Sequence, residues 1–470
     1  MKSRHQWYIL TSVAFGTFMA TLDSSIVNIV LPTLSKALTA DLHQVKWIVI
    51  VYLFTVTALL LPFGKLSDHI GRKRVFQTGL MLFVLGSALC SLAPDLNTLI
   101  LFRVIQAIGA AMLFANAPAI ITSTFSRKQR GTALGILTMA VSIGLVSGPS
   151  LGGLLISNIG WRSIFWINIP IGALGISFVQ RYLPRDKPSI IPDSFDWAGA
   201  LLQMVFLLLF MLLFNAPDVQ ILKQASQLLH GTQFLLTLCV ILIGSLFLHV
   251  ERQCKQPLFD TLLFRNRTFW TANAASFLFF MSFSSVHLLV PFFLEDIQQL
   301  SPQKAGLLMT SIPLTIFVAA PISGRISDRM GSRGLSLLGA AIGSLTLLKM
   351  GGVFGTGFTN QTASWEIFTS LAGIGLATGI FQSPNNSSIM GVVAETKINT
   401  ASAMLATIRN LGSVTGTGLS SSLFTWNLHQ EGGFLTSFHT VLCICGCIAL
   451  AAMGISWVKP KGPHSFEEKN

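Results

Sequence analysis

Charged side chains are scarce in this sequence. Only 10% of its 470 residues are Asp, Glu, Lys or Arg, whereas 51% are hydrophobic. A soluble domain carries about a quarter of its residues as charged side chains, and so few charges cannot cover a surface that faces water. Apolar runs recur along the whole chain, and roughly 20 apolar residues form a helix that crosses the hydrocarbon core of a bilayer. The sequence therefore predicts an all-α integral membrane protein with the lipid bilayer as its surroundings.

Motifs for several chemistries are missing as well. The chain has no G-x-x-x-x-G-K-[ST] loop for ATP phosphates and no metal-hydrolase motif. No polar segment between apolar runs exceeds about twenty residues, which excludes a hidden soluble catalytic or sensory domain. We expect no enzyme activity, no metal and no cofactor, and an ion gradient is the remaining energy source.

Cysteines are few. Six in the chain give no disulfide framework, although Cys443, Cys445 and Cys447 form a C-x-C-x-C run. Residues i and i+2 of a helix point to nearly opposite sides, so these thiols do not converge on a metal ion. Small apolar packing is the favoured interpretation.

Hydropathy and helix-breaking residues predict fourteen spans. The start of the chain, residues 1–31, also has the basic and apolar parts of a signal peptide, but it lacks a small-x-small cleavage site, so we expect an uncleaved first span. The predicted spans lie near residues 8–31, 46–63, 76–93, 97–122, 132–156, 164–183, 197–215, 232–250, 268–292, 304–322, 335–354, 366–391, 399–426 and 436–457.

The positions of Lys and Arg test this count, because cytoplasmic loops of membrane proteins carry an excess of these residues. With a cytoplasmic N-terminus, 23 of the 31 basic residues fall on the cytoplasmic side and 6 on the opposite side, while Arg103 and Arg409 remain inside spans. A missed or invented span would scramble this alternation. We therefore expect fourteen transmembrane helices with both termini cytoplasmic. The net charge of +13 follows from the loops, and we expect no nucleic-acid partner.

The chain also repeats itself. The segment 64–71, GKLSDHIG, reappears after 260 residues as 324–331, GRISDRMG. A second echo joins the fourth and twelfth spans and pairs Ile108, Gly109, Asn116 and Pro118 with Ile374, Gly375, Gln382 and Pro384. We predict a 6+2+6 arrangement of four regions: residues 1–183 as an N-terminal six-helix half, 184–267 as a linker with two extra transmembrane helices, 268–458 as a C-terminal six-helix half and 459–470 as a cytoplasmic tail.

Several motifs together resemble one family. They are the loop Gly64–Arg74, Leu22–Pro32 in the first span, Arg103–Gly109 in the fourth, Gly144–Gly153 in the fifth and Trp161–Pro170 before the sixth. Over nearly the whole chain the sequence resembles the major facilitator superfamily, and within it the fourteen-helix drug:proton antiporter group of the EmrB/QacA type. The resemblance implies a major facilitator-type fold and transport by alternating access.

The repeated loop motif is a candidate cytoplasmic gate. Its residues are Gly64, Asp68, Gly71 and Arg72 in the first copy and Gly324, Asp328 and Gly331 in the second. Glycine permits close approach of a neighbouring helix, and the first aspartate can accept hydrogen bonds from a facing helix N-terminus or from the arginine. The alternative is an ordinary basic loop, which the second copy at a fixed offset disfavours.

Asp23 and Arg103 are the candidates for proton coupling. A carboxylate inside hydrocarbon costs about 2.5 to 3.5 kcal/mol at a helix centre, and removal from water favours its protonated form. At about 1.5 Å per residue, Asp23 lies about 21 Å from the cytoplasmic face and Arg103 about 9 Å from the opposite face, so their depths coincide. We expect Arg103 to compete with the proton for Asp23. A static ion pair is the alternative. Thr369 occupies the place of Arg103 in the second half, so proton handling belongs to the first.

The fifth span and scattered polar residues complete the candidates. Glycines 144, 148 and 152 form a smooth stripe on one helix face, and Pro149 removes a backbone donor. By resemblance this segment is an antiporter helix (Gly144, Gly148, Pro149, Gly152), whereas physics alone also allows plain helix packing. Candidate cavity residues are Gln106, Asn116, Gln382, Asn386 and Arg409, with interhelical hydrogen bonding or ion pairing as the alternative.

Our sequence-based expectation is a proton-coupled secondary active efflux transporter for drugs or other lipophilic or cationic toxic compounds. The alternative is an exporter or importer of one endogenous solute, such as a siderophore or another metabolite. A non-transporting membrane sensor is disfavoured, because no sizeable soluble segment exists. The expected partners are the small-molecule substrate and protons, with a periplasmic adaptor left open. We expect a monomer in the bacterial inner membrane.

Overall fold

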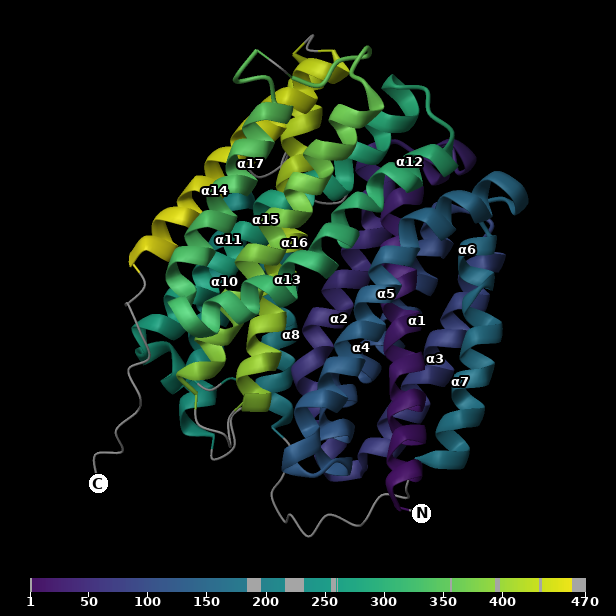
Figure 1. Ribbon diagram of the computed structural model, residues 1–470, viewed down its shortest axis with the longest axis vertical. Helices are drawn as coiled ribbons and strands as arrows, with labels where there is room; N and C mark the ends of the chain where they lie inside the picture. Colours follow the sequence, from purple (N-terminus) through teal and green to yellow (C-terminus); the bar gives the residue numbers. More distant parts are fainter. Residues whose placement is uncertain are drawn as a thin grey trace. The chain divides into compact units, whose positions relative to one another are not determined.

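The computed structural model describes residues 2–183, 196–215, 232–254, 259, 261–355, 357–393, 398–430 and 433–458. Parts of the predicted linker and the whole predicted tail, 459–470, lie outside these residues. Within them the chain is helical throughout and contains no strand, which confirms the predicted all-α class (Figure 1).

The long helices correspond one by one to the predicted spans. Twelve helical segments of the described residues are long and apolar enough to cross a membrane, and α14 and α16 are two further long helices of more polar composition. The count of fourteen crossings and the cytoplasmic termini stay predictions. The elements are α1 Lys2–Ala37, α2 Leu42–Ile70, α3 Arg72–Leu92, α4 Leu96–Thr124, α5 Arg127–Ile159, α6 Ser163–Trp166, α7 Asn168–Tyr182, α8 Trp197–Asn215, α10 Thr232–Gln253, η2 Thr261–Arg265, α11 Arg267–Phe292, η3 Phe293–Ile297, α12 Pro302–Met309, α13 Ser311–Met330, α14 Ser332–Met350, α15 Ser364–Gly391, α16 Ile398–His429 and α17 Phe434–Val458.

Two predicted spans are interrupted. The sixth is divided at Ile167 into the single turn α6 and the longer α7, and the tenth is divided at Thr310 into α12 and α13. In contrast, α5 runs through Pro149 as one helix. A proline, Pro170 or Pro313, follows each break by three residues, which is a signal for a helix start that hydropathy alone does not detect.

The described chain forms two compact units. The first comprises residues 1–204 together with Ser301–Leu307, and the second comprises 205–300 and 308–470. The short α12 segment thus joins the first unit, although the sequence places it in the second half. The four predicted regions are not tested by this division.

Glycines bring helices of the first unit together. An added Cβ at Gly86 on α3 would lie 2.6 Å from the backbone nitrogen of Gln106 on α4, and Gly144 and Gly148 of α5 face α1 in the same way. Helices pack this closely only where no side chain intervenes. Figure 1 shows α1 running beside α5 and α7.

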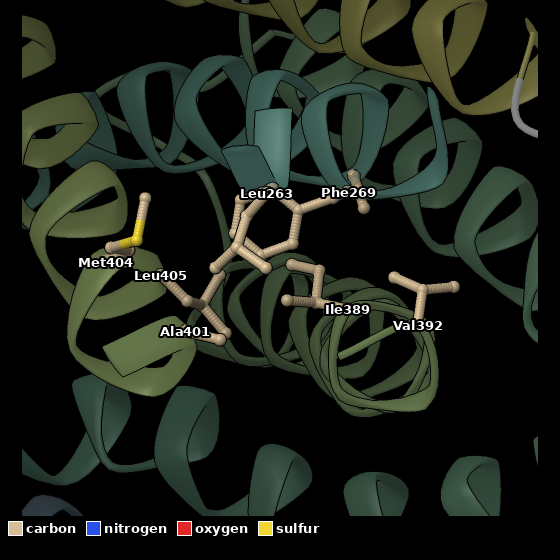
Figure 2. Close-up of a cluster of buried hydrophobic side chains, with 8 residues drawn as sticks. Leu263, Phe269, Ile389, Val392, Ala401, Met404 and Leu405 are labelled. Atoms are coloured by element: carbon tan, nitrogen blue, oxygen red, sulfur yellow. The ribbon is translucent and has the colours of Figure 1, made fainter. Parts of the chain in front are cut away.

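The second unit is packed around α11. A buried apolar cluster joins the first turns of α11 to the end of α15 and the start of α16 (Figure 2), and its members are Leu263, Phe269, Ala272, Ile389, Val392, Ala401, Met404 and Leu405. Further along the pair α11 and α16, Gly412 and Gly416 leave no room for a Cβ against the carbonyl oxygens of Phe277 and Met281. The α11–α16 contact is therefore tight over several turns.

The repeat seen in the sequence has a structural counterpart in each unit. Gly71 ends α2 with φ 106° and Gly331 ends α13 with φ 82°, and the two backbone N–H groups bond to the carbonyl oxygens of Ser67 and Ser327. Only glycine adopts this backbone region without strain. Both copies of the motif therefore turn the chain in the same way between two helices.

Candidate functional site

A buried polar network in the first unit surrounds Asp23 of α1. Asp23 is 1% exposed, and its carboxylate accepts three hydrogen bonds. One oxygen accepts from the Arg103 guanidinium at 2.6 Å, and the other accepts from the side-chain amides of Gln106 and Asn168, each at 2.8 Å. Both oxygens of the Asp23 carboxyl group are therefore hydrogen-bonded in surroundings that exclude water.

Arg103 of α4 is equally enclosed. It is 1% exposed, and its guanidinium also donates to the Gln106 side-chain oxygen at 2.6 Å. The ring centroid of Tyr52 lies 4.2 Å from the guanidinium carbon and that of Phe165 lies 5.8 Å from it. The aromatic faces and the carboxylate together compensate the positive charge in surroundings that exclude water.

Local structure explains how α3 and α7 bring their side chains to this network. Gly86 lets α3 approach α4 so closely that Ser87, the next residue, accepts from the Gln106 amide at 2.6 Å. Asn168 begins α7 directly after the break at Ile167, and its amide reaches both Asp23 and, at 3.2 Å, the hydroxyl oxygen of Ser87. The interruption of the sixth span thus places a polar side chain beside the carboxylate.

The network connects the Asp23 carboxyl group to side chains on several helices. If Asp23 accepts a proton, the Arg103 guanidinium loses its counter-charge, and breaking a buried pair in this way costs about 3–5 kcal/mol. The helices that carry Arg103, Gln106 and Asn168 are then expected to rearrange or to admit water. The arrangement can therefore convert a change of protonation into a change of helix packing.

The candidate gate motif is present at the end of α2. Arg72 donates to the Asp68 carboxylate at 2.9 Å and to the Ala119 carbonyl oxygen of α4 at 3.0 Å. This pair is partly exposed, unlike that of Asp23. In the second copy Gly324 and Gly331 lie at corresponding points of α13, while the Asp328 side chain lies outside the described part of the chain.

The glycine stripe of α5 packs on α1. Gly144 faces the Phe18 carbonyl oxygen, Gly148 faces Ser25, and Gly152 faces Ile26. The Ser25 hydroxyl donates to the Leu145 carbonyl oxygen at 2.9 Å. The stripe therefore lies against the helix that carries Asp23, which fits both the packing role and the antiporter role.

The predicted cavity residues divide into two groups. Gln106 and Asn116 are fully buried: Gln106 belongs to the Asp23 network, and Asn116 donates to the Met112 carbonyl oxygen of its own helix at 2.8 Å. Gln382, Asn386 and Arg409, all in the second unit, are half-buried. The side chains of the second group therefore keep part of their surface exposed.

The cysteine run behaves as separate residues. Cys443 donates to the Gly351 carbonyl oxygen at 3.3 Å, Cys445 is buried, and Cys447 is exposed. Among the described residues, no group of three or more His, Cys, Asp or Glu side chains is arranged to hold a metal ion.

Sequence reasoning did not assign Ser87, Asn168, Tyr52 or Phe165 to this site. Asn168 had a visible signal, since it is an amide inside an apolar run two residues before Pro170. Ser87, Tyr52 and Phe165 had none, because such residues are common in transmembrane helices for other reasons.

A protein-family profile matches most of the chain. The family profile described as Major Facilitator Superfamily matches residues 13–417 and, in a second match, 272–469.

Individual relatives cover nearly the whole chain. The chain is 35% identical over 431 residues to the riboflavin transporter RibZ of Clostridioides difficile (strain 630), which covers 92% of this chain and 91% of that protein. It is 31% identical over 418 residues to the methylenomycin A resistance protein of Streptomyces coelicolor, covering 87% and 83%. Multidrug resistance proteins, such as Stp of Mycobacterium tuberculosis at 29% identity, are also similar.

Two solved structures share the fold. A bacterial homologue of the human lysosomal transporter Spinster, inward-facing and unoccupied, has a TM-score of 0.66 at 15% identity and covers 97% of both chains. The peptide transporter POT in complex with sulfate has a TM-score of 0.69 at 16% identity and covers 97% of this chain and 96% of that chain. At these identities the likeness shows the fold alone.

Proposed function

This chain belongs to the Major Facilitator Superfamily and is a multi-pass membrane transporter, and from this premise we propose that it exports lipophilic toxic compounds in exchange for protons, as a fourteen-helix drug:proton antiporter. The observation that carries the proposal is the sealed Asp23–Arg103 pair, with hydrogen bonds from Gln106 and Asn168. An intramembrane carboxylate is expensive, and a role in proton transfer gives a reason for it.

The proposed cycle uses competition for one carboxylate. In the arrangement described here Arg103 forms an ion pair with Asp23. A proton that enters from the outside neutralises Asp23 and releases Arg103, and the helices rearrange toward the inside. Release of the proton inside restores the ion pair. Solute would leave on the outward-open part of the cycle, and the relatives named for drug resistance support export as its direction.

The test uses purified protein in proteoliposomes with an imposed pH gradient and a fluorescent lipophilic substrate. Asp23→Asn keeps the shape of the side chain but removes the protonatable group. We expect it to abolish gradient-driven uphill transport while leaving any downhill exchange.

A matched control is Asp95→Asn. Asp95 is an exposed N-cap of α4, and Asn caps a helix as well as Asp. This variant should transport like the parent. Uphill transport by Asp23→Asn at the parental rate would refute proton coupling through Asp23.

A second candidate function is transport of one aromatic metabolite. The 35% identity to a riboflavin transporter over 92% of the chain favours it. The same proteoliposomes, offered riboflavin and a panel of lipophilic dyes, separate the two functions. A response confined to riboflavin would favour the second candidate, whereas transport of several unrelated dyes would favour the first.

We further propose a monomer in the bacterial inner membrane with both termini cytoplasmic and no cofactor beyond the proton gradient. A periplasmic adaptor protein remains a candidate partner. Cysteine accessibility at the two ends of the chain, read in intact cells, would test the orientation.

A further inference from the structure

The second unit contains a cation within a spanning helix that forms no ion pair with any described carboxylate. Arg409 lies twelve residues into α16, and it is half-buried. Its guanidinium carbon lies 5.6 Å from the ring centroid of Phe280 on α11. Among the described residues, no carboxylate forms an ion pair with it. An unpaired guanidinium within a spanning helix is costly, so a use for it is expected.

The described acidic residues of the second unit lie at helix ends. Glu251 is near the end of α10, Glu295 and Asp296 are in η3, and Glu366 is in the first turn of α15. Glu295 is fifteen residues beyond Phe280 along the same apolar run, which corresponds to about 22 Å of helix. The structure shows no ion pair between Arg409 and any of these described carboxylates, so none of them neutralises the charge that a ligand could meet.

The segment of α16 that carries Arg409 is packed against neighbouring helices on both sides of this residue. One turn before it, Leu405 belongs to the buried cluster that joins α16 to α11 and α15 (Figure 2). One turn after it, Gly412 packs on the Phe277 backbone without room for a Cβ. Phe280 itself packs edge-on against Phe279, with ring centroids 5.7 Å apart. The helix segments that carry the two binding groups are therefore packed before any ligand arrives, which lowers the entropic cost of binding.

We propose that Arg409 and Phe280 form a substrate subsite for planar aromatic solutes that carry an anionic or carbonyl-rich edge. The guanidinium offers a planar set of N–H donors that matches carboxylate and carbonyl oxygens, and the phenylalanine ring packs on the aromatic face of the solute. The same uncompensated charge repels a cationic solute, and more strongly here than in water. The subsite deepens the proposed function and rests on it, since it restricts the lipophilic substrates to neutral and anionic ones.

Binding without a gradient tests the subsite. The full chain in nanodiscs is titrated with two dyes that share a xanthene ring, fluorescein as the anionic probe and rhodamine 6G as the cationic one, and binding is followed by fluorescence anisotropy. The parent should bind fluorescein more tightly. Arg409→Gln should weaken fluorescein binding by about tenfold or more, as expected for loss of charge-assisted hydrogen bonds, and leave rhodamine 6G equal or tighter. Arg409→Lys should be intermediate, and Phe280→Leu should weaken both dyes.

Arg333→Gln is the matched control. Arg333 on α14 also lies over an aromatic ring, that of Trp457 at 5.2 Å, so the variant removes the same charge and the same kind of contact elsewhere in the second unit. It should leave the dye preference unchanged.

Three results would overturn the proposal. They are no fluorescein binding by the parent, unchanged fluorescein binding in Arg409→Gln, or an equal loss of both dyes in that variant. Because no proton gradient is applied, these results are independent of Asp23, and Asp23→Asn should still bind fluorescein. Failure of proton coupling and failure of the subsite are thus read separately.

Discussion

Two arginines inside spanning helices meet opposite surroundings. Arg103 in the first unit is sealed, paired with Asp23 and flanked by Tyr52. Arg409 in the second unit is half-buried, lies beside one aromatic ring and pairs with no described carboxylate. A compensated charge suits an exchange of protons within the protein, whereas an uncompensated one suits a ligand from outside. Under the two proposals above, the first unit carries out proton coupling and the second carries out solute recognition.

The largest expected difference concerns stability. Arg103→Leu leaves the buried Asp23 carboxylate without its counter-charge and should destabilise the protein by about 3–5 kcal/mol. Arg409→Leu removes an unpaired charge and should be neutral or stabilising. Denaturant unfolding of the protein in detergent micelles measures both.

A double variant controls this comparison. Asp23→Asn combined with Arg103→Leu removes both charges and should recover part of the loss, since neighbouring residues do not act additively. Equal destabilisation by Arg103→Leu and Arg409→Leu would break the distinction between the two arginines.

A second prediction concerns the amide beside Asp23. Asn168→Ala removes a hydrogen bond to a charged group and should cost about 1.5–3 kcal/mol. Asn116→Ala is the control: it is an equally buried amide that bonds only to its own helix, and its loss should cost about 0.5–1.5 kcal/mol. The shift of the unfolding midpoint from the parent value, measured for each variant, checks this prediction. Equal shifts would argue against a special role for Asn168.

Glycine contacts allow each arginine site to be disturbed separately. Gly86→Ala pushes α3 away from Gln106, and Gly412→Ala pushes α16 away from α11. Overpacking of this kind costs about 1–3 kcal/mol. We expect the first variant to impair uphill transport with fluorescein binding retained, and the second to impair fluorescein binding.

The control for both glycines is Gly391→Ala. An added Cβ there meets nothing within 4 Å, so neither readout should change. If the two variants affected both readouts alike, the division of work between the units would not hold.

The smallest effect is expected at the start of α4, the helix that carries Arg103. The backbone N–H of Thr98, at 2.9 Å from the Asp95 carboxylate, and then its hydroxyl hold the pKa of Asp95 below its ordinary value of 3.8. A carboxyl group with a lowered pKa contributes stability above its ordinary pKa and loses it as the pH falls through the lowered value.

Asp95→Ala should therefore lower the thermal midpoint slightly at neutral pH, and the difference from the parent should shrink as the pH falls below 3.8. Asp95→Asn should match the parent at neutral pH, because Asn is an equivalent cap. A difference that persists unchanged in acid would show that the carboxylate is not responsible.

Much of the fold was readable because the bilayer constrains it. Hydropathy predicted the long helices, and residue counting along them placed Asp23 and Arg103 at one depth; the structure brings these side chains to 2.6 Å. Rise per residue is nearly constant in helices, so depth is predictable from sequence.

The remaining features of the site depend on how each helix is rotated about its axis and on where helices are interrupted. Hydropathy encodes neither. The break at Ile167 turns Asn168 toward Asp23, and close packing at Gly86 brings Ser87 to Gln106. Gln106 was expected to line a cavity but lies in the sealed network. Which face of a spanning helix meets another helix depends on partners far away in the sequence.

The α12 segment, which belongs to the first unit, makes a contact with a mechanical consequence. In the first unit α12 meets α5 backbone to backbone: a Cβ at Gly153 would overlap the Pro302 carbonyl oxygen, and one at Gly306 would overlap the carbonyl oxygen of Pro149. At these two points the nearest atoms belong to the backbone. The two helices can therefore separate and return without any change of side-chain rotamer. In the alternating-access cycle proposed above, this contact can open and close without rearrangement of side chains, and a single added methyl group would keep it from closing.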